Sequence, residues 1–311
     1  MSSLWAFPGQ GAQQAGMLHA LPDEAVVREC LEQAATALGD DVLKLDGAEA
    51  LQSTRAVQLC LLIAGVAGAR LLQSHGCQPD YVAGLSIGAY PAAVIADSLD
   101  FDDAVRLVAL RGELMQNAYP QGYGMTAILG LDQALVESLI ARVHSQQMPV
   151  YLANINADSQ LVIAGSTAAM AEVARHAKAQ GAASCKRLAV SVPSHCELLQ
   201  SPARDLADAF TRVHIAAPKV RYLSGSTARP LVKPYQVRAD LAFNMCRVID
   251  WRSTVQTAYE RGVRLQIEFA PGTVLTGLAR RVFEQGTALA FQGARLDSLV
   301  ALSREEEART L

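Results

Sequence analysis

A serine set between two glycines constrains this chain more than any other feature, because of what flanks it. Residues 81–83 are apolar and predict a short buried strand, residues 84–88 read Gly-Leu-Ser-Ile-Gly, and an Ala-rich helix is expected from Tyr90. Glycines allow a tight turn that a Cβ would obstruct. The helix that follows directs backbone N–H groups towards the serine. A purely structural turn is the alternative, but this order favours a Ser86 hydroxyl that projects from the end of a strand.

Composition excludes several classes of protein. The chain has 311 residues, of which 51% are hydrophobic and 18% charged, so it has enough apolar residues for a large core. A net charge of −3 with no basic run argues against nucleic acid as a partner. The apolar stretch 59–72 is too short and too interrupted to span a bilayer, and no secretory signal is visible. We therefore expect a soluble cytoplasmic protein without a membrane partner.

The six cysteines are scattered through the chain and show no Cys-x-x-Cys spacing. This pattern is typical of reduced thiols in a cytosolic protein. We expect no metal site.

The pattern of elements changes in the middle of the chain. Six successive segments predict a strand, a helix, two strands, a helix and a strand, at 125–129, 132–143, 150–155, 161–164, 168–180 and 184–190. That order is the ferredoxin-like arrangement. We therefore expect an α/β protein in which a small α+β subdomain, residues 125–192, is inserted into a larger core of residues 1–124 and 193–311.

Three further residues are candidates for chemistry. A serine nucleophile needs a base, and His195 lies on a loop at the junction of the two parts, where functional groups concentrate. Arg111 follows an apolar helical stretch and is either an interfacial arginine or a bidentate clamp for a carboxylate. Asp250 stands at a segment boundary and is either a helix cap or a partner that orients a histidine.

Taken together, these motifs resemble the malonyl-CoA:acyl-carrier-protein transacylase family over nearly the whole chain. The resemblance rests on the serine turn together with Phe7-Pro8-Gly9-Gln10-Gly11, Arg111-Gly112, Asn154-Ile155-Asn156, Val162-Ile163-Ala164-Gly165, Ser191-Val192-Pro193-Ser194-His195-Cys196 and Pro271-Gly272-Thr273-Val274-Leu275-Thr276-Gly277-Leu278. It implies an α/β-hydrolase-like core with a mostly parallel sheet and a ferredoxin-like insert, which agrees with the pattern of elements.

The resemblance also implies a role for each candidate residue. Ser86 would be acylated, with His195 as its general base and then as the acid for the leaving thiol. Backbone N–H groups of Gln10 and Ile87 would form the oxyanion hole. Arg111 would hold the malonyl carboxylate and so exclude acetyl groups. The substrate would be malonyl-CoA and the acceptor a prosthetic-group thiol on a small acyl carrier protein, with no metal or cofactor bound to this chain.

The sequence departs from the fatty-acid enzymes of that family at several positions. These enzymes commonly read Gly-His-Ser-Leu-Gly-Glu at the turn, where this chain has Leu85, Ile87 and Ala89, and the nearest match to their Thr-Gln-Pro-Ala segment is 54–56. The departures resemble the epsilon subunit of bacterial malonate decarboxylase, which loads malonyl onto a dedicated carrier subunit. We therefore expect malonyl transfer within malonate decarboxylase. The alternatives are the transacylase of fatty-acid synthesis, a serine thioesterase or hydrolase, and a carrier-docking subunit without catalysis.

Asp250 is a further departure, because the family has a glutamine shortly before the tryptophan. In the family a main-chain carbonyl near this position orients the catalytic histidine. We expect the backbone of Asp250 to orient His195, with the carboxylate in a secondary role.

Overall fold

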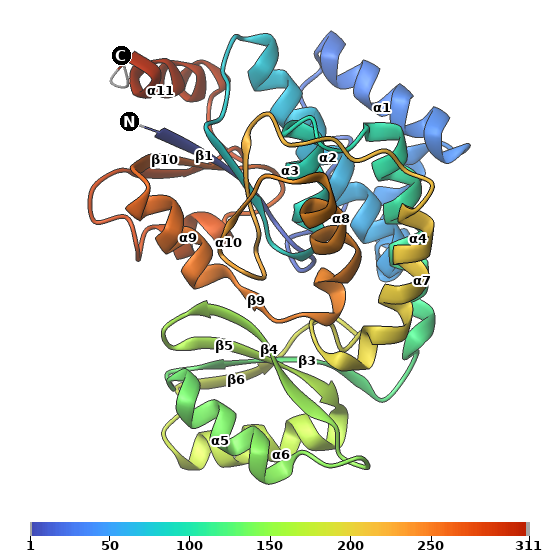
Figure 1. Cartoon of the computed structure of the whole chain (residues 1–311), viewed down its shortest axis with the longest axis vertical. Coiled ribbons are helices and arrows are strands. Elements are labelled where there is room, and N and C mark those ends of the chain that lie inside the picture. Colours follow the sequence, from blue (N-terminus) through green and yellow to red (C-terminus); the bar gives the residue numbers. More distant parts are fainter. Residues whose placement is uncertain (1, 309–311) are drawn as a thin grey trace.

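The computed structural model describes residues 2–308 and contains two β-sheets, each covered by helices (Figure 1). The larger sheet has the strand order β11-β10-β1-β2-β7-β8. Its strands are β1 (Ser2–Phe7), β2 (Tyr81–Gly84), β7 (Arg221–Leu223), β8 (Pro230–Leu231), β10 (Val263–Glu268) and β11 (Thr287–Ala290). All neighbouring strands run parallel except β7 and β8. This confirms the expected α/β core with a mostly parallel sheet.

Strand β1 shows why helices cover both faces of this sheet. Its residues 4–7 are apolar without alternation, and successive side chains of a strand point to opposite faces. Trp5 and Phe7 pack into one core cluster and Leu4 and Ala6 into another. The helices around the larger sheet are α1 (Ala25–Leu38), α2 (Thr54–Ser74), α3 (Ala89–Ile95), α4 (Phe101–Ala118), α7 (Gln200–Phe210), α8 (Pro234–Phe243), α9 (Trp251–Glu260), α10 (Val274–Ala279) and α11 (Leu296–Ala308).

Helix α2 is the main core helix beside this sheet. By length and composition alone it could cross a membrane, but most of its apolar stretch is buried inside the protein. Gly65 allows close packing, because a Cβ there would lie 3.1 Å from the Phe7 ring and 3.2 Å from Pro91. The apolar character of α2 is therefore explained by its place between the sheet and the other helices.

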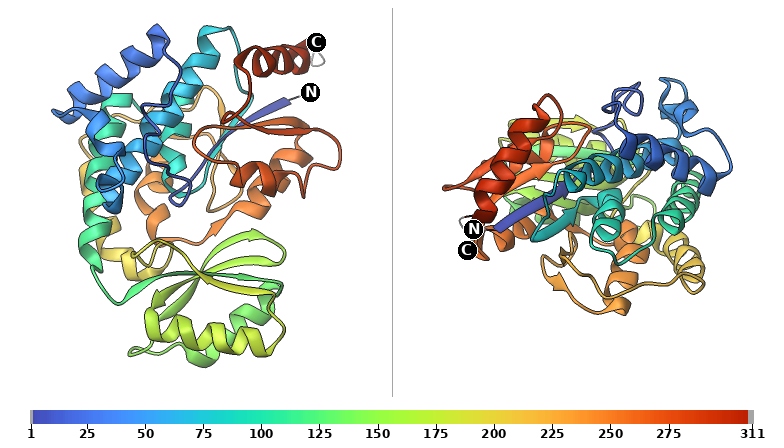
Figure 2. Two further views of the ribbon diagram at one scale, coloured as in Figure 1. Left: turned by 180° about the vertical axis from the view of Figure 1, so that it is seen from behind. Right: turned by 90° about the horizontal axis from the view of Figure 1, so that it is seen from above.

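The smaller sheet has the strand order β6-β3-β5-β4-β9. Its elements are β3 (Tyr123–Leu129), α5 (Gln133–Val143), β4 (Val150–Ala157), β5 (Gln160–Ser166), α6 (Thr167–Ala179), β6 (Ser184–Arg187) and β9 (Ile249–Asp250). The first four strands pair antiparallel, and α5 and α6 lie together on the outer face (Figures 1 and 2). This is the ferredoxin-like order expected from the sequence.

Strand β9 is an addition that the sequence pattern did not predict. It comes from the C-terminal part of the chain and pairs in parallel with β4.

The expected boundary at residue 125 falls inside β3, which begins at Tyr123. The division into 1–124, 125–192 and 193–311 stays a prediction.

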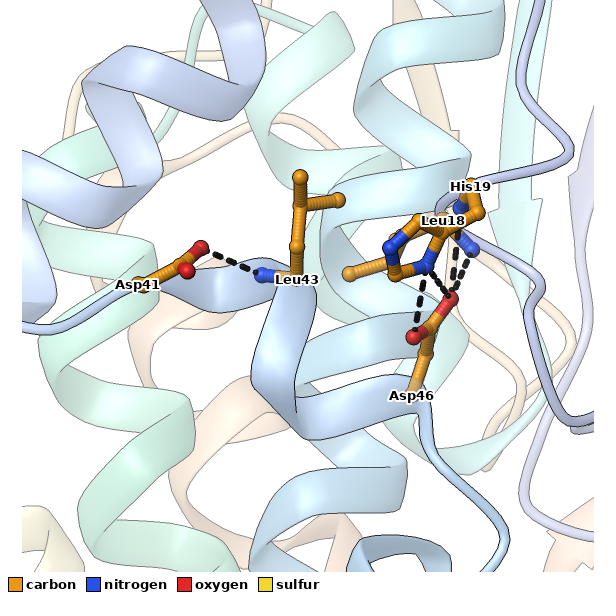
Figure 3. Close-up of polar contacts among 5 residues, drawn as sticks. All are labelled: Leu18, His19, Asp41, Leu43 and Asp46. Carbon is orange, nitrogen blue, oxygen red and sulfur yellow. Dashed lines mark hydrogen bonds and ion pairs between the residues drawn. The ribbon is translucent and has the colours of Figure 1, made fainter.

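The loop that leaves β1 is fixed at its far end by a buried carboxylate (Figure 3). Asp46 accepts hydrogen bonds from the backbone N–H groups of Leu18, at 2.8 Å, and His19, at 3.2 Å. The Nδ1 atom of His19 also lies 2.9 Å from the Asp46 carboxylate. These bonds hold residues 18–19 in place, and so restrict the preceding loop, 8–15, which carries Gln10.

Candidate active site

The serine turn has the geometry that its two glycines predict. A Cβ on Gly84 would lie 1.9 Å from the backbone of Gly88, and a Cβ on Gly88 would lie 2.2 Å from the carbonyl oxygen of Phe7. Neither contact is possible for a larger residue. Ser86 itself has φ +58°, in the left-handed region that few residues other than glycine adopt. The turn therefore places Ser86 at the carboxyl end of β2, in the middle of the larger sheet.

A pocket of about 460 Å³ opens between the two sheets, at the carboxyl ends of β1 and β2. Ligands of open parallel sheets bind at this end of the strands. The core contributes the loop 8–13, Ser86 and His195, and the smaller sheet contributes residues such as Met125 and Asn154. The pocket therefore needs both parts of the chain.

His195 lies between β6 and the short helix η4 (Glu197–Leu199), and its side chain is buried. Its Nδ1 atom is 2.7 Å from the carbonyl oxygen of Asn244. Because a carbonyl only accepts, Nδ1 carries the proton and Nε2 is the basic atom of the neutral ring. The pKa of His195 is lowered to about 4, mainly because burial disfavours the charged ring. The Asn244 carbonyl opposes this shift, and the charge of Arg111 adds to it.

Arg111 lies on α4 and is completely buried beside the serine. Its Nη2 donates to Ser86 Oγ at 3.3 Å and to Asn244 Oδ1 at 3.0 Å, and its Nη1 donates to Gln58 Oε1 at 2.6 Å. Its Nε has no partner, and among residues 2–308 no carboxylate pairs with it. Burial lowers the pKa of Arg111, yet a guanidinium remains charged. A buried cation without a counter-ion is suited to an anionic ligand.

Comparison with known proteins agrees with this geometry. Residues 4–309 match the model of the acyl transferase domain family. The malonyl CoA-acyl carrier protein transacylase of Haemophilus influenzae is 38% identical over 283 residues, which cover 89% of this chain and 90% of that protein. The protein of that name from Bacillus subtilis is 31% identical and covers 97% of this chain and 96% of its own length. The chain belongs to the malonyl-CoA:acyl carrier protein transacylase family.

Solved structures of this family have the same fold. FabD from Acinetobacter baumannii superposes with a TM-score of 0.93 at 36% identity, covering 98% of this chain and 99% of that one. A malonyl-transacylase solved in complex with a type II PKS acyl-carrier protein superposes with a TM-score of 0.91 at 35% identity, covering 98% of this chain and 100% of that one.

The two backbone groups expected to bind the oxyanion come from neighbouring segments. Gln10 lines the pocket on the loop that leaves β1, and Ile87 directly follows Ser86. The two segments are in direct contact, because Leu85 N–H donates to the carbonyl oxygen of Phe7 at 3.0 Å. Their use as oxyanion donors stays a prediction.

The structure corrects the expectation that Asp250 orients His195. The carbonyl on Nδ1 belongs to Asn244, six residues earlier in the chain. The Asp250 carboxylate instead accepts from Ser253 N–H at 2.9 Å and caps α9. The Asp250 carbonyl accepts from the Thr254 hydroxyl at 2.8 Å. The helix-cap alternative is therefore the correct one, because an acidic residue just before a helix satisfies N–H groups that have no partner within the helix.

The sequence pattern did not predict two residues that belong to the candidate active site, Gln58 and Asn244. Gln58, in α2, binds Arg111 and lies four residues beyond Thr54, where the expected counterpart of the Thr-Gln-Pro-Ala segment began. A single amide in the otherwise apolar stretch 56–69 is the signal that could have found it. Asn244, in the short helix η5 (Asn244–Cys246), binds Arg111 and donates from Nδ2 to the Ser86 carbonyl at 3.2 Å. Nothing in its local sequence marks it.

Across residues 2–308, no group of three or more His, Cys, Asp or Glu residues is placed to hold a metal ion. All six cysteines are free.

Proposed function

We propose that this protein transfers malonyl from malonyl-CoA to the prosthetic-group thiol of an acyl carrier protein, through a malonyl ester on Ser86. The observation that carries the proposal is Arg111, a buried guanidinium 3.3 Å from Ser86 Oγ that has no carboxylate partner among residues 2–308. A malonyl group that is bound for transfer to Ser86 would place its negatively charged carboxylate beside the guanidinium of Arg111. A plain esterase needs no such cation.

The neutral ring of His195 takes the proton of Ser86 as Oγ attacks the thioester carbonyl carbon. The new C–O bond gives a tetrahedral intermediate, whose oxyanion accepts from the N–H groups of Gln10 and Ile87. The C–S bond then breaks, and the imidazolium returns the proton to the leaving CoA thiol. The carbonyl of Asn244 stabilises the imidazolium through Nδ1. The carrier thiol attacks malonyl-Ser86 in the reverse sequence.

Acyl selectivity follows from the cost of an unpaired buried charge. A malonyl carboxylate would give Arg111 its counter-ion, whereas an acetyl group would leave the guanidinium without one. Leaving a buried charge unpaired costs about 3–5 kcal/mol. We therefore expect malonyl to be strongly preferred over acetyl.

Fatty-acid synthesis is the context that the comparisons support better. The relatives described above are named for transfer to acyl carrier protein, and one solved relative is bound to a type II PKS acyl-carrier protein rather than to a malonate decarboxylase subunit. The malonate decarboxylase context rests only on departures of this sequence from the fatty-acid enzymes, chiefly Leu85, Ile87 and Ala89 in the serine turn. We propose the cytoplasm as the location, where malonyl-CoA and the carrier are available.

Intact-mass spectrometry after mixing the protein with malonyl-CoA or acetyl-CoA tests the proposal. We expect a lasting malonyl adduct that Ser86→Ala abolishes, and little acetyl adduct unless Arg111 is replaced by alanine. Release of CoA without an adduct would indicate a hydrolase, and neither product would indicate a docking subunit. Offering the malonyl-enzyme a fatty-acid carrier and a carrier with a dephospho-CoA-type group then decides between the two contexts.

A further inference from the structure

The groups that hold Arg111 are neutral, which is unusual for a buried arginine. Buried charged side chains are almost always paired with a charge of opposite sign. Here the acceptors are the amide oxygens of Gln58 and Asn244 and the hydroxyl of Ser86. The guanidinium is therefore fixed in direction while its charge remains uncompensated.

Each amide is oriented by a second contact. Gln58 Nε2 donates to the sulfur of Met115 at 3.3 Å, which leaves Oε1 for Arg111. Asn244 Nδ2 donates to the carbonyl oxygen of Ser86 at 3.2 Å, which leaves Oδ1 for Arg111. Both side chains are at most 2% exposed. Because neither side chain reaches solvent, water does not compensate the charge of Arg111 through Gln58 or Asn244.

A buried acid does lie near this region, but its bonds go elsewhere. Asp240, on α8, accepts from the hydroxyls of Tyr222, at 2.8 Å, and Ser224, at 2.5 Å. Tyr90 presents its ring to the guanidinium, with 5.8 Å from the Arg111 Cζ atom to the ring centroid. Aromatic rings attract cations without neutralising them.

We propose that Gln58 and Asn244 determine acyl specificity by being neutral. They hold Arg111 in place and leave the acyl carboxylate as its counter-ion, a role that rests on the function proposed above. Glutamate has nearly the shape of glutamine, so the substitution Gln58→Glu would place a carboxylate at the 2.6 Å position and pair it with Arg111 permanently. A malonyl carboxylate would then meet an ion pair with no net charge, and the carboxylate of that pair would repel it. An acetyl group would no longer leave Arg111 as an unpaired buried cation.

The test compares Gln58→Glu with Gln58→Met, which has a similar length but adds no charge. The measured quantity is the ratio of kcat/KM for malonyl-CoA to kcat/KM for acetyl-CoA. We expect Gln58→Glu to lower this ratio about a hundredfold, by losing malonyl activity and gaining relative acetyl activity. Gln58→Met removes one hydrogen bond to Arg111, so it lowers both activities and keeps the ratio within about tenfold of the wild type.

Two further variants keep the test decisive. In an Arg111→Ala background, the carboxyl introduced by Gln58→Glu has no cation beside it and takes up a proton in its buried place, so the ratio should stay unchanged. If Gln58→Glu does not fold, Asn244→Asp brings the negative charge from the other side of the guanidinium and should also lower the ratio. The proposal is overturned if Gln58→Glu keeps the wild-type ratio, or if Gln58→Met lowers it as much. A wild-type enzyme without malonyl preference would instead overturn the proposed function and this inference with it.

Discussion

Two residues of the candidate site adopt a backbone conformation that side chains disfavour. Ser86 has φ +58° and His195 has φ +65°. Residues other than glycine rarely adopt such angles, and when they do the surrounding structure must hold them there. For His195, the N–H group donates to the carbonyl of Met245 at 2.7 Å. The loop between β6 and η4 and the segment around η5 are thus tied together at the histidine itself.

Burial of His195 has a direct consequence for the pH dependence of acylation. With a pKa lowered to about 4, the ring is neutral and able to act as a base throughout the range above about pH 5. We expect the rate of malonyl-Ser86 formation at low substrate, measured by quenched-flow mass spectrometry, to stay level from pH 8 to about pH 5.5 and to fall below that. A decline centred near pH 6.5 would show that the ring titrates as an exposed histidine and would contradict this expectation.

At this scale the sequence predicted the residues that carry a motif and missed those that support them. Ser86 was predicted because two glycines and a strand specify its turn. Gln58 and Asn244 meet Arg111 only because α2, α4 and η5 pack together, 53 and 133 residues apart in sequence from the arginine. The wrong expectation for Asp250 has a related cause. The position of Asp250 beside the tryptophan does not reveal which backbone carbonyl reaches His195 in the folded chain.

Among the elements, the serine turn depends most on a single residue type. A Cβ at Gly84 would lie 1.9 Å from the backbone of Gly88, and neither segment can move without displacing β2 or α3. We expect Gly84→Ala to lower the free energy of unfolding by about 3 kcal/mol or more, or to prevent folding. Gly277, in α10, is the matched control, because a Cβ there meets nothing within 4 Å. Gly277→Ala should leave stability unchanged or raise it by up to about 1 kcal/mol in denaturant titrations. Wild-type stability for Gly84→Ala would contradict the close packing described here.

Elements with a clear local pattern were predicted well, such as the short strand at 81–83, and elements that depend on distant contacts were not. The helix expected over 132–143 spans 133–143, with Asp132 as its cap. The strand expected over 184–190 ends at Arg187, because residues 188–190 turn to line the pocket. Strand β9 has two residues and exists only through its pairing with β4. No local pattern of two residues can specify such a pairing.

At the scale of the whole molecule, β9 connects the two sheets. Its backbone extends the smaller sheet, through the pairing of Ile249 with Asn154. The side chain of Ile249 packs instead into the core of the larger sheet, in the cluster that contains Leu4 and Leu223. The N–H group of Asp250 donates to the carbonyl of Gly225, beyond the end of β7, at 2.8 Å. The pocket between the sheets therefore has its walls joined at this strand.

Ile249→Ala should weaken both sheets, because losing the side-chain packing of Ile249 in the larger sheet also loosens the backbone strand that pairs with β4. The substitution removes buried methyl groups at a cost of about 2–5 kcal/mol. We expect hydrogen exchange, followed by mass spectrometry of peptides, to become faster in β4 and in β2 alike. Val173→Ala is the control, since Val173 packs only within the outer core of the smaller sheet and should speed exchange there while leaving β2 as in the wild type. Unchanged exchange in β4 after Ile249→Ala would show that the smaller sheet does not depend on this strand, and that the walls of the pocket are held together by other contacts.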